Sequence, residues 1–410
     1  MEIKPILKTL LRNKIGVVVI AAQVALTLAI ASNVFYIVRD RVAAARQPSG
    51  VDEQNVFRIR ASSYRKLADP MAQQKIDEQL LRTIPGVRSV ATVNQVPLGQ
   101  SGSNSGVFVD RKQIDSTSNA AFYESATSMV DTLGLKVIEG RDFLPEEYLE
   151  TNGGPPFPTS LPIIISEGLA KKLFPDETRY TGRVVYRGSG DDAGELRIVG
   201  VVEQLTTPWG RTSWGSTTGV ESVITPLRLP EASPQYIVRT EPGTLAEVMK
   251  AADAALVKPG DGRILQPANS MLELRERRYR NDYFLSSMMA TMTGMLVLVT
   301  ASGILGMASF WVGQRRKQIG VRRALGARRS DILRYYLLEN FIVTTIGIGI
   351  GVVLALSLNF MIAESLQLAR LPLGNLLAGM FLLWAVGQLA TLFPARRAAM
   401  IAPATATRTV

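Results

Sequence analysis

The sequence predicts an α-helical membrane protein with four transmembrane helices and one large α/β domain outside the bilayer. The first observation is that four long stretches carry no charged residue, and about 20 apolar residues in a helix are enough to cross the ~30 Å hydrocarbon core. The second is that the excess of positive charge lies only in segments that flank these stretches. The predicted transmembrane spans are residues 15–38, 284–313, 340–363 and 371–394.

The distribution of charge predicts the orientation of the chain. Of the net charge of +11, residues 1–14 carry +3, residues 314–339 carry +6 and residues 395–410 carry +3, whereas residues 39–282 carry −1. The three basic segments fall on one side of a four-span topology, which is the positive-inside pattern. We therefore expect both termini in the cytoplasm and the large domain outside. Nucleic acid is not an expected partner, because the large soluble domain is nearly neutral.

Residues 1–14 predict a cytoplasmic amphipathic helix, since Ile3, Leu7 and Leu10 share one helical face. The alternative is a short basic flank. A basic segment followed by an apolar stretch is also typical of a cleaved signal peptide. The apolar core of a signal peptide has only about 7–15 residues, however, and the stretch 15–38 is longer. We interpret residues 15–38 as a retained transmembrane helix. Residues 395–410 are the expected cytoplasmic tail.

Residues 39–282 predict an α/β domain with short elements. A strand–helix–strand pattern covers residues 56–96 and recurs at residues 235–266. The sequence between these halves indicates one βαβ-repeat subdomain with a second subdomain inserted into it. We place the first subdomain at residues 50–137 and 221–270 and the insert at residues 138–220.

The charged segment 271–283 predicts a helix that leads into the second span. If this helix is continuous with the span, it forms a rigid stalk between the external domain and the bilayer. The alternative is a solvated helix with no such role.

The residue types present restrict the chemistry that this chain can perform. It has no cysteine and no histidine, which excludes disulfides, thiolate nucleophiles and zinc sites built on these residues. The adjacent pairs Asp191-Asp192 and Glu146-Glu147 are typical of solvated loops. No GxxxxGK[ST] phosphate-binding loop occurs in the sequence. We predict no catalytic residue, no metal site and no cofactor bound by this chain, and therefore no enzyme activity of its own.

Small residues in the spans suggest close helix packing. Gly347 and Gly351 are four residues apart, and Gly303 and Gly306 offer a second small face. Either face could pair with a second chain or with a helix of the same chain. No charged residue lies in the middle of a span, which argues against an ion pathway.

The basic segment 314–339 carries the most specific motif, RRKQIGVRRALGARRSDILRYYLLE from Arg315. It resembles the R-x-x-E-I-G-I-R-[RK]-A-[LM]-G-A segment of the MacB/FtsX-type permeases of ATP-binding cassette (ABC) systems. The pieces LGLKVIEGRDF, IIISEGLAKKLFP and LRIVGVV resemble recurring parts of the external domain of that family, and PARRAA near the end resembles its closing motif. Gln318 departs from the pattern, because the family usually has glutamate at this position.

The resemblance implies an inner-membrane protein of a bacterium with a MacB-like periplasmic domain, whose βαβ-repeat subdomain is porter-like. It implies two copies of a separate ATPase, which bind ATP and magnesium, and a second permease chain, either identical or related. The export branch also uses a periplasmic adaptor and an outer-membrane channel, and membrane lipids surround the spans. No ATPase is expected to be fused to this chain. The residues that match the ATPase-docking and coupling segment are Ile319, Gly320, Arg322, Arg323, Ala324, Leu325, Gly326 and Ala327.

Three functions are compatible with the resemblance. The first is a permease subunit of a MacB-like exporter that passes motion from the ATPase to the periplasmic domain. The second is an FtsX-like subunit that transmits a signal to a periplasmic partner. The third is a permease that releases lipoproteins from the membrane.

The predicted topology can be tested by thiol labelling, because the natural chain has no cysteine. A cysteine introduced by Ser189→Cys is expected to react with a membrane-impermeant thiol reagent in intact spheroplasts, since residue 189 lies in the external domain. A cysteine introduced by Ser330→Cys is expected to react only after the membrane is opened. Labelling in the reverse pattern would show that the chain has the opposite orientation.

Overall fold

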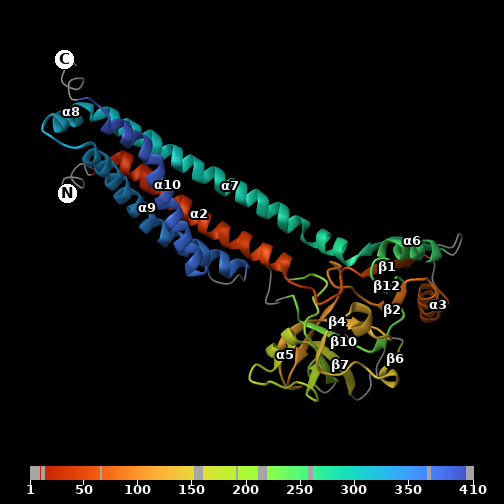
Figure 1. Ribbon diagram of the computed structural model, residues 1–410. Helices are drawn as coiled ribbons and strands as arrows, with labels where there is room; N and C mark the ends of the chain where they lie inside the picture. The colour runs from red at the N-terminus through yellow and green to blue at the C-terminus, as the bar shows by residue number, and fades with distance from the viewer. Residues whose placement is uncertain are drawn as a thin grey trace. The chain divides into compact units, whose positions relative to one another are not determined.

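The computed structural model describes residues 10, 14–64, 67–151, 160–190, 193–210, 219–256, 262–366 and 371–402, with only the backbone for 362–366. The chain divides into a membrane unit, Met1–Val42 with Asp282–Val410, and an external unit, Ala43–Asn281 (Figure 1). Most of the predicted helix 1–14, the pair Asp191-Asp192 and half of the predicted tail 395–410 lie outside the described residues.

The prediction of four helices able to span a membrane is confirmed. These are α2 (Lys14–Arg46), α7 (Met271–Gln314), α9 (Arg329–Leu366) and α10 (Leu373–Ala399). Each is longer than the expected span, because charged residues at its ends continue the helix beyond the uncharged stretch. The predicted stalk and second span are one helix of 44 residues, α7.

Helix α2 connects the membrane helices through both apolar and polar contacts. The buried residues Val24 and Leu28 belong to an apolar cluster shared with α7, α9 and α10. Thr27 and Thr300 join α2 to α7 through a hydrogen bond of 2.8 Å between their hydroxyls. Asn33 Nδ2 donates to the carbonyl oxygen of Ala355 at 3.1 Å, which joins α2 to α9. Polar side chains in a bilayer need such partners, because no water is available to replace them.

The small residues of α9 also pack against α2. A Cβ atom added to Gly347 would lie 2.8 Å from the carbonyl oxygen of Ala21, and one added to Gly351 would lie 3.0 Å from Cα of Ala25. The Cβ of a residue at Gly303 would lie 2.5 Å from the Gln23 side chain of α2. These three glycines therefore serve contacts within the chain. Gly306 has no described atom within 4 Å of its Cβ position.

The external unit contains a four-stranded antiparallel sheet in the order β13-β1-β12-β2. Two βαβ units interlock in this sheet, because the last strand of each unit is separated from its first strand by a strand of the other. Helices α3 and α6 contribute Leu81 and Val248 to the apolar core of this subdomain. The strands are β1 (Val56–Ser63), β2 (Val87–Val93), β12 (Gln235–Thr240) and β13 (Arg263–Ser270), and the helices are α3 (Pro70–Arg82) and α6 (Leu245–Leu256).

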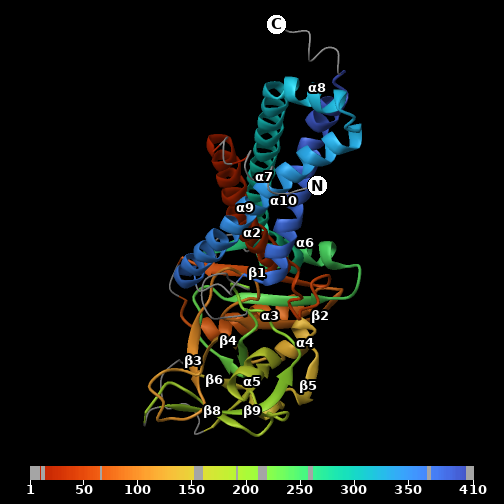
Figure 2. The ribbon, with the colours of Figure 1, turned by 90° about the vertical axis from the view of Figure 1, so that its left-hand side faces the viewer.

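A second sheet has seven strands in the order β5-β9-β7-β10-β4-β3-β8. Figure 2 labels β3, β4, β5, β8 and β9 among them. A further pairing between β8 and β9 closes six of these strands into a ring. Its strands are β3 (Asn104–Phe108), β4 (Ser118–Glu124), β5 (Val137–Gly140), β7 (Leu161–Ser166), β8 (Val184–Arg187), β9 (Gly194–Val202) and β10 (Ser222–Thr225). The shorter elements are β6 (Leu149–Glu150), β11 (Leu227–Arg228), α4 (Met129–Leu133), α5 (Glu167–Leu173) and the 3-10 turn Pro145–Glu147.

The limits of this second subdomain differ from the expected 138–220. Strands β3 and β4, which precede residue 138, and β10, which follows residue 220, all belong to the seven-stranded sheet. Strands β3 and β10 were not predicted from the sequence, because they are only five and four residues long. In addition, β3 lies beside Gly- and Ser-rich segments that are typical of exposed loops. The chain crosses between the subdomains near residues 94–103 and 229–234.

The contact between α2 and α9 can be tested with a matched pair of glycine substitutions. Gly347→Ala is expected to lower the free energy of unfolding by about 1–3 kcal/mol, because the new methyl group meets the backbone of α2. Gly349→Ala, on the same helix, meets no described atom within 4 Å and is expected to be neutral or slightly stabilising. Thermal unfolding of the purified chain in detergent measures the difference, and equal effects would argue against this packing.

Candidate functional site

The basic segment 314–339 forms two helices joined by a turn at one end of the membrane unit. The helix axis breaks at Arg315, α8 covers Arg316–Ala324, and α9 begins at Arg329. Gly326 has φ of 95°, a left-handed conformation that strains other residues. The sequence predicts 314–339 as a cytoplasmic coupling loop of helical character, and its residues 329–339 are the first three turns of α9.

Helix α8 is held by a small apolar cluster. Ile319 is buried among Ile332 and Tyr336 of α9 and Ala395 and Ala398 of α10. Figure 1 shows α8 at the end of the membrane unit where α10 finishes. The inner face of α8 is thus fixed to two membrane helices, and its outer face is exposed.

A buried ion pair lies beside this cluster. Arg315 Nη1 donates to both carboxylate oxygens of Glu339, at 2.9 Å and 2.8 Å. The Glu339 side chain is 1% exposed and that of Arg315 is 11% exposed. An unpaired buried charge is strongly destabilising, so the pair fixes the junction of α7 and α8 against α9. Glu339 is one of only two acidic residues in the basic segment, and the sequence pattern does not indicate which arginine it meets.

The arginines of α8 have different surroundings. Arg323 Nη1 donates to the carbonyl oxygens of Ala399 and Ile401, at 3.2 Å and 2.8 Å, and so caps the end of α10. Arg322 is exposed, and its guanidinium carbon lies 5.1 Å from the centre of the Tyr335 ring. Arg323 therefore stabilises the site, whereas Arg322 is accessible on its surface.

The structure divides the eight predicted site residues into an inner and an outer group. Ile319 and Gly320 are buried, and Arg323 bonds to α10. Leu325 is 83% exposed, and Val321, which was not among the eight, is 51% exposed. Arg322, Ala324 and Gly326 are exposed as well, and Ala327 is half-buried. The outer group combines two large apolar side chains with a cation, which is typical of a surface that contacts another protein.

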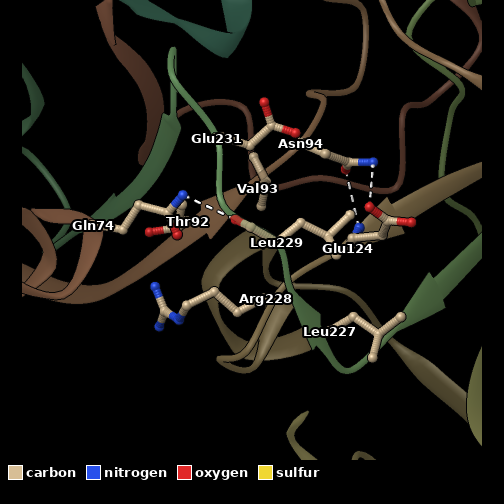
Figure 3. A pocket seen from close by; sticks show the side chains of 9 residues that line it. All are labelled: Gln74, Thr92, Val93, Asn94, Glu124, Leu227, Arg228, Leu229 and Glu231. Carbon is tan, nitrogen blue, oxygen red and sulfur yellow. Dashed lines mark hydrogen bonds between the residues drawn. The ribbon is translucent and has the colours of Figure 1, made fainter. Parts of the chain in front are cut away.

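A second candidate is a small pocket between the two subdomains of the external unit (Figure 3). Arg228 lines the pocket and donates to both oxygens of the neighbouring Glu78, at 2.9 Å and 3.1 Å, in a buried ion pair. Gln74 Nε2 also donates to the carbonyl oxygen of Leu229 at 3.0 Å. The space that remains holds about one water molecule. The residues around this pocket connect the two subdomains, and its volume is too small for a ligand larger than a water molecule.

Glu124 lines the same pocket. Figure 3 shows it beside Asn94, whose Nδ2 donates to Glu124 Oε2 at 3.3 Å and whose Oδ1 accepts from the Glu124 backbone at 3.0 Å. Burial raises the pKa of Glu124, the nearby Arg187 partly opposes this increase, and the charge of Glu231 adds to it. Burial also raises the pKa of Glu231. The surroundings of the pocket therefore disfavour the simultaneous ionisation of Glu124 and Glu231.

Four apolar helices, a βαβ-repeat external domain between the first two, and a basic helix–turn after the second define the class of an ABC transporter permease. The MacB-like periplasmic core domain family matches residues 14–255 of this chain. The FtsX-like permease C-terminal family matches residues 290–403. The chain belongs to the MacB/FtsX family of ABC transporter permeases.

Curated relatives agree with this assignment. The macrolide export ATP-binding/permease protein MacB of Bordetella avium (strain 197N) is 27% identical over 255 residues, which are 59% of this chain and 37% of the relative. The protein of the same name from Neisseria gonorrhoeae (strain ATCC 700825 / FA 1090) is 24% identical over 297 residues, 68% of this chain and 41% of the relative. The chain thus spans about two fifths of the length of these relatives.

One solved structure is also similar in part. It is the extracellular domain of the noncanonic ABC-type transporter YknZ from Gram-positive bacteria, with 16% sequence identity and a TM-score of 0.31. The match covers 51% of this chain and 99% of that domain.

The raised pKa of Glu124 predicts how stability depends on pH. The folded state binds this proton more tightly than the unfolded state, so the contribution of Glu124 to stability falls as pH rises through the folded-state pKa. Glu124→Gln keeps a polar side chain without the charge. It is expected to make the external domain more stable than the natural protein at pH 8, with a difference that shrinks as the pH falls toward 4.

Thermal unfolding of the full chain in detergent at a series of pH values measures this difference. A Glu146→Gln variant, in the exposed turn Pro145–Glu147, provides the control and is expected to follow the natural protein at every pH. A Glu124→Gln variant that is less stable at pH 8 would mean that its charged form is favoured in the folded state.

Proposed function

We propose that this chain is the permease subunit of a MacB-like ABC exporter in the bacterial inner membrane. A separate ATPase would bind ATP and magnesium and would dock on the outer face of α8 and the turn that follows. Two permease chains and two ATPases would form the working unit, with both permease termini in the cytoplasm and the external unit in the periplasm. Substrate would leave through the periplasmic side, where an adaptor and an outer-membrane channel could continue the path.

The observation that carries the proposal is the asymmetry of α8. Its inner face packs on α9 and α10 through Ile319. Arg315, which directly precedes α8, forms an ion pair with Glu339. Its outer side exposes Val321, Arg322 and Leu325. A force applied to the outer face would therefore move the attached membrane helices rather than only the loop.

Helix α7 supplies the route by which such a movement would reach the external unit. It begins within that unit, where Met271 and Tyr279 are buried in an apolar core. Arg275 donates to the backbone oxygens of Ala45 and Gln47, at 2.9 Å and 3.0 Å, and forms an ion pair with Glu53. The first turns of α7 are therefore held firmly by the domain that it would move, as mechanical transmission requires.

Removing the exposed apolar contact on α8 tests the proposal. Leu325→Asp is expected to reduce the binding of the ATPase at least tenfold, because a buried apolar anchor of an interface typically contributes about 2 kcal/mol or more. Arg322→Glu is expected to act in the same direction. Arg323 is left unchanged, since its substitution would disturb the end of α10.

Tagged chain would be purified from solubilised membranes, and the co-purifying ATPase would be assayed for hydrolysis stimulated by the permease. Arg334→Glu provides the control, because this exposed residue lies on α9 and outside the proposed docking surface. Normal stimulation by the Leu325→Asp variant would reject α8 as the docking element. Co-purification of a cell-wall hydrolase in place of an adaptor would support the signalling function instead.

A further inference from the structure

A second pocket lies at the basic end of the membrane unit, between α8 and the beginning of α9. One wall contains Arg315, Gln318 and Arg322, and the other contains Tyr335 and Tyr336. The cavity volume is about 40 Å³, which is room for about three water-sized groups. It is therefore large enough to admit the oxygens of one small oxyanion.

The polar groups that line the pocket favour an anion. Arg315 uses Nη1 to bond Glu339, but its Nη2 is buried without a hydrogen-bond partner in the described part of the chain. A buried donor without an acceptor costs about 1–3 kcal/mol, so an acceptor at this point would be stabilised. Arg322 supplies a second guanidinium to the lining of the pocket, and no acidic residue lines it among the described residues.

Gln318 keeps this excess of positive charge. It is the one position of the basic motif at which the sequence has an uncharged amide where the resembling motif has glutamate. A carboxylate there would stand on the same wall as the two arginines and would neutralise them. The amide leaves the charge available and adds a further hydrogen-bond donor.

The depth of the pocket in the membrane indicates which anion is available. Arg315 follows directly after the uncharged stretch that ends at Gln314, and Trp311 lies one turn earlier in α7. Tryptophan and tyrosine concentrate at the headgroup level of bilayers. At this level the most abundant oxyanion is the phosphate of a phospholipid. Basic pockets between helices on the cytoplasmic side bind such headgroups, and anionic lipids concentrate near exposed basic residues.

We propose that this pocket binds the phosphate of an anionic phospholipid, with the guanidiniums of Arg315 and Arg322 and the Gln318 amide as donors. The bound headgroup would connect α8 to α9 from the open side of the pocket. The pocket shares Arg322 with the proposed docking surface, but the binding of lipid can be measured in the absence of the ATPase.

Native mass spectrometry of the full chain in detergent tests the proposal directly. The chain would be titrated with phosphatidylglycerol, with phosphatidylcholine and with inorganic phosphate, and the affinity for each would be measured. The natural chain is expected to bind phosphatidylglycerol about tenfold more tightly than phosphatidylcholine, because only the first carries a net negative charge.

Arg322→Gln is expected to weaken the binding of phosphatidylglycerol about tenfold, as loss of a hydrogen bond to a charged group does. Gln318→Glu is expected to have a similar effect while leaving both arginines in place. If the Arg322→Gln variant does not fold, the Gln318→Glu variant still tests the proposed site. The matched control is Arg329→Gln, which removes the same charge from an exposed residue that does not line the pocket.

Arg329→Gln is expected to change the affinity by less than twofold. An equal loss in Arg322→Gln and Arg329→Gln would show general attraction of lipids to a basic surface and would overturn the proposed site. Equal affinity for the two phospholipids would overturn it as well. Saturation by inorganic phosphate with no retained lipid would reject the lipid and assign the pocket to a free anion.

Discussion

The organisation of the basic end of this permease depends on the buried ion pair between Arg315 and Glu339. Both groups lose water on folding, and the desolvation of a single unpaired charge at this depth would be costly. The pair is satisfied only when the end of α7 and the third turn of α9 lie together, so it allows few arrangements of the intervening α8. Ile319 and the cap that Arg323 forms on α10 then fix the remaining freedom of this short helix. A buried ionic pair of this kind need not add stability to specify one geometry.

A similar constraint operates deeper in the membrane unit. Apolar contact between helices gives little advantage over contact with lipid, so close packing and hydrogen bonds must choose the partners of each helix. The glycines of α9 allow the backbone of α2 to approach, and Asn33 and Thr27 of α2 bond to α9 and α7. Helix α2 is therefore connected to its neighbours by contacts that are specific in position. A force on α8 would therefore act on four helices that are connected to one another, and not on a single helix.

The features that were predictable from the sequence are those that depend on local pattern. Charge-free stretches gave the four helices, because the thickness of a bilayer sets the length of a span. The motif around Arg322 indicated the family, which the family models match, whereas the docking role of its residues stays a proposal. The limits of the seven-stranded sheet were not predictable, since strands such as β10 have four residues and acquire their identity from distant partners. The pairing of Arg315 with Glu339 was missed for the same reason, because a single acidic residue in a basic segment does not indicate which arginine it meets.

The eight basic residues of segment 314–339 do not share one role. Net charge decides on which side of the membrane the segment lies, and every arginine and lysine contributes equally to that decision. The roles differ only after folding, when Arg315 and Arg323 turn toward partners within the chain while Arg322 and Arg329 remain exposed. A substitution that reverses one of the inward residues would damage the scaffold, and its effect on coupling would say little about docking. The outward residues are therefore the ones whose substitution reports on what the segment contacts.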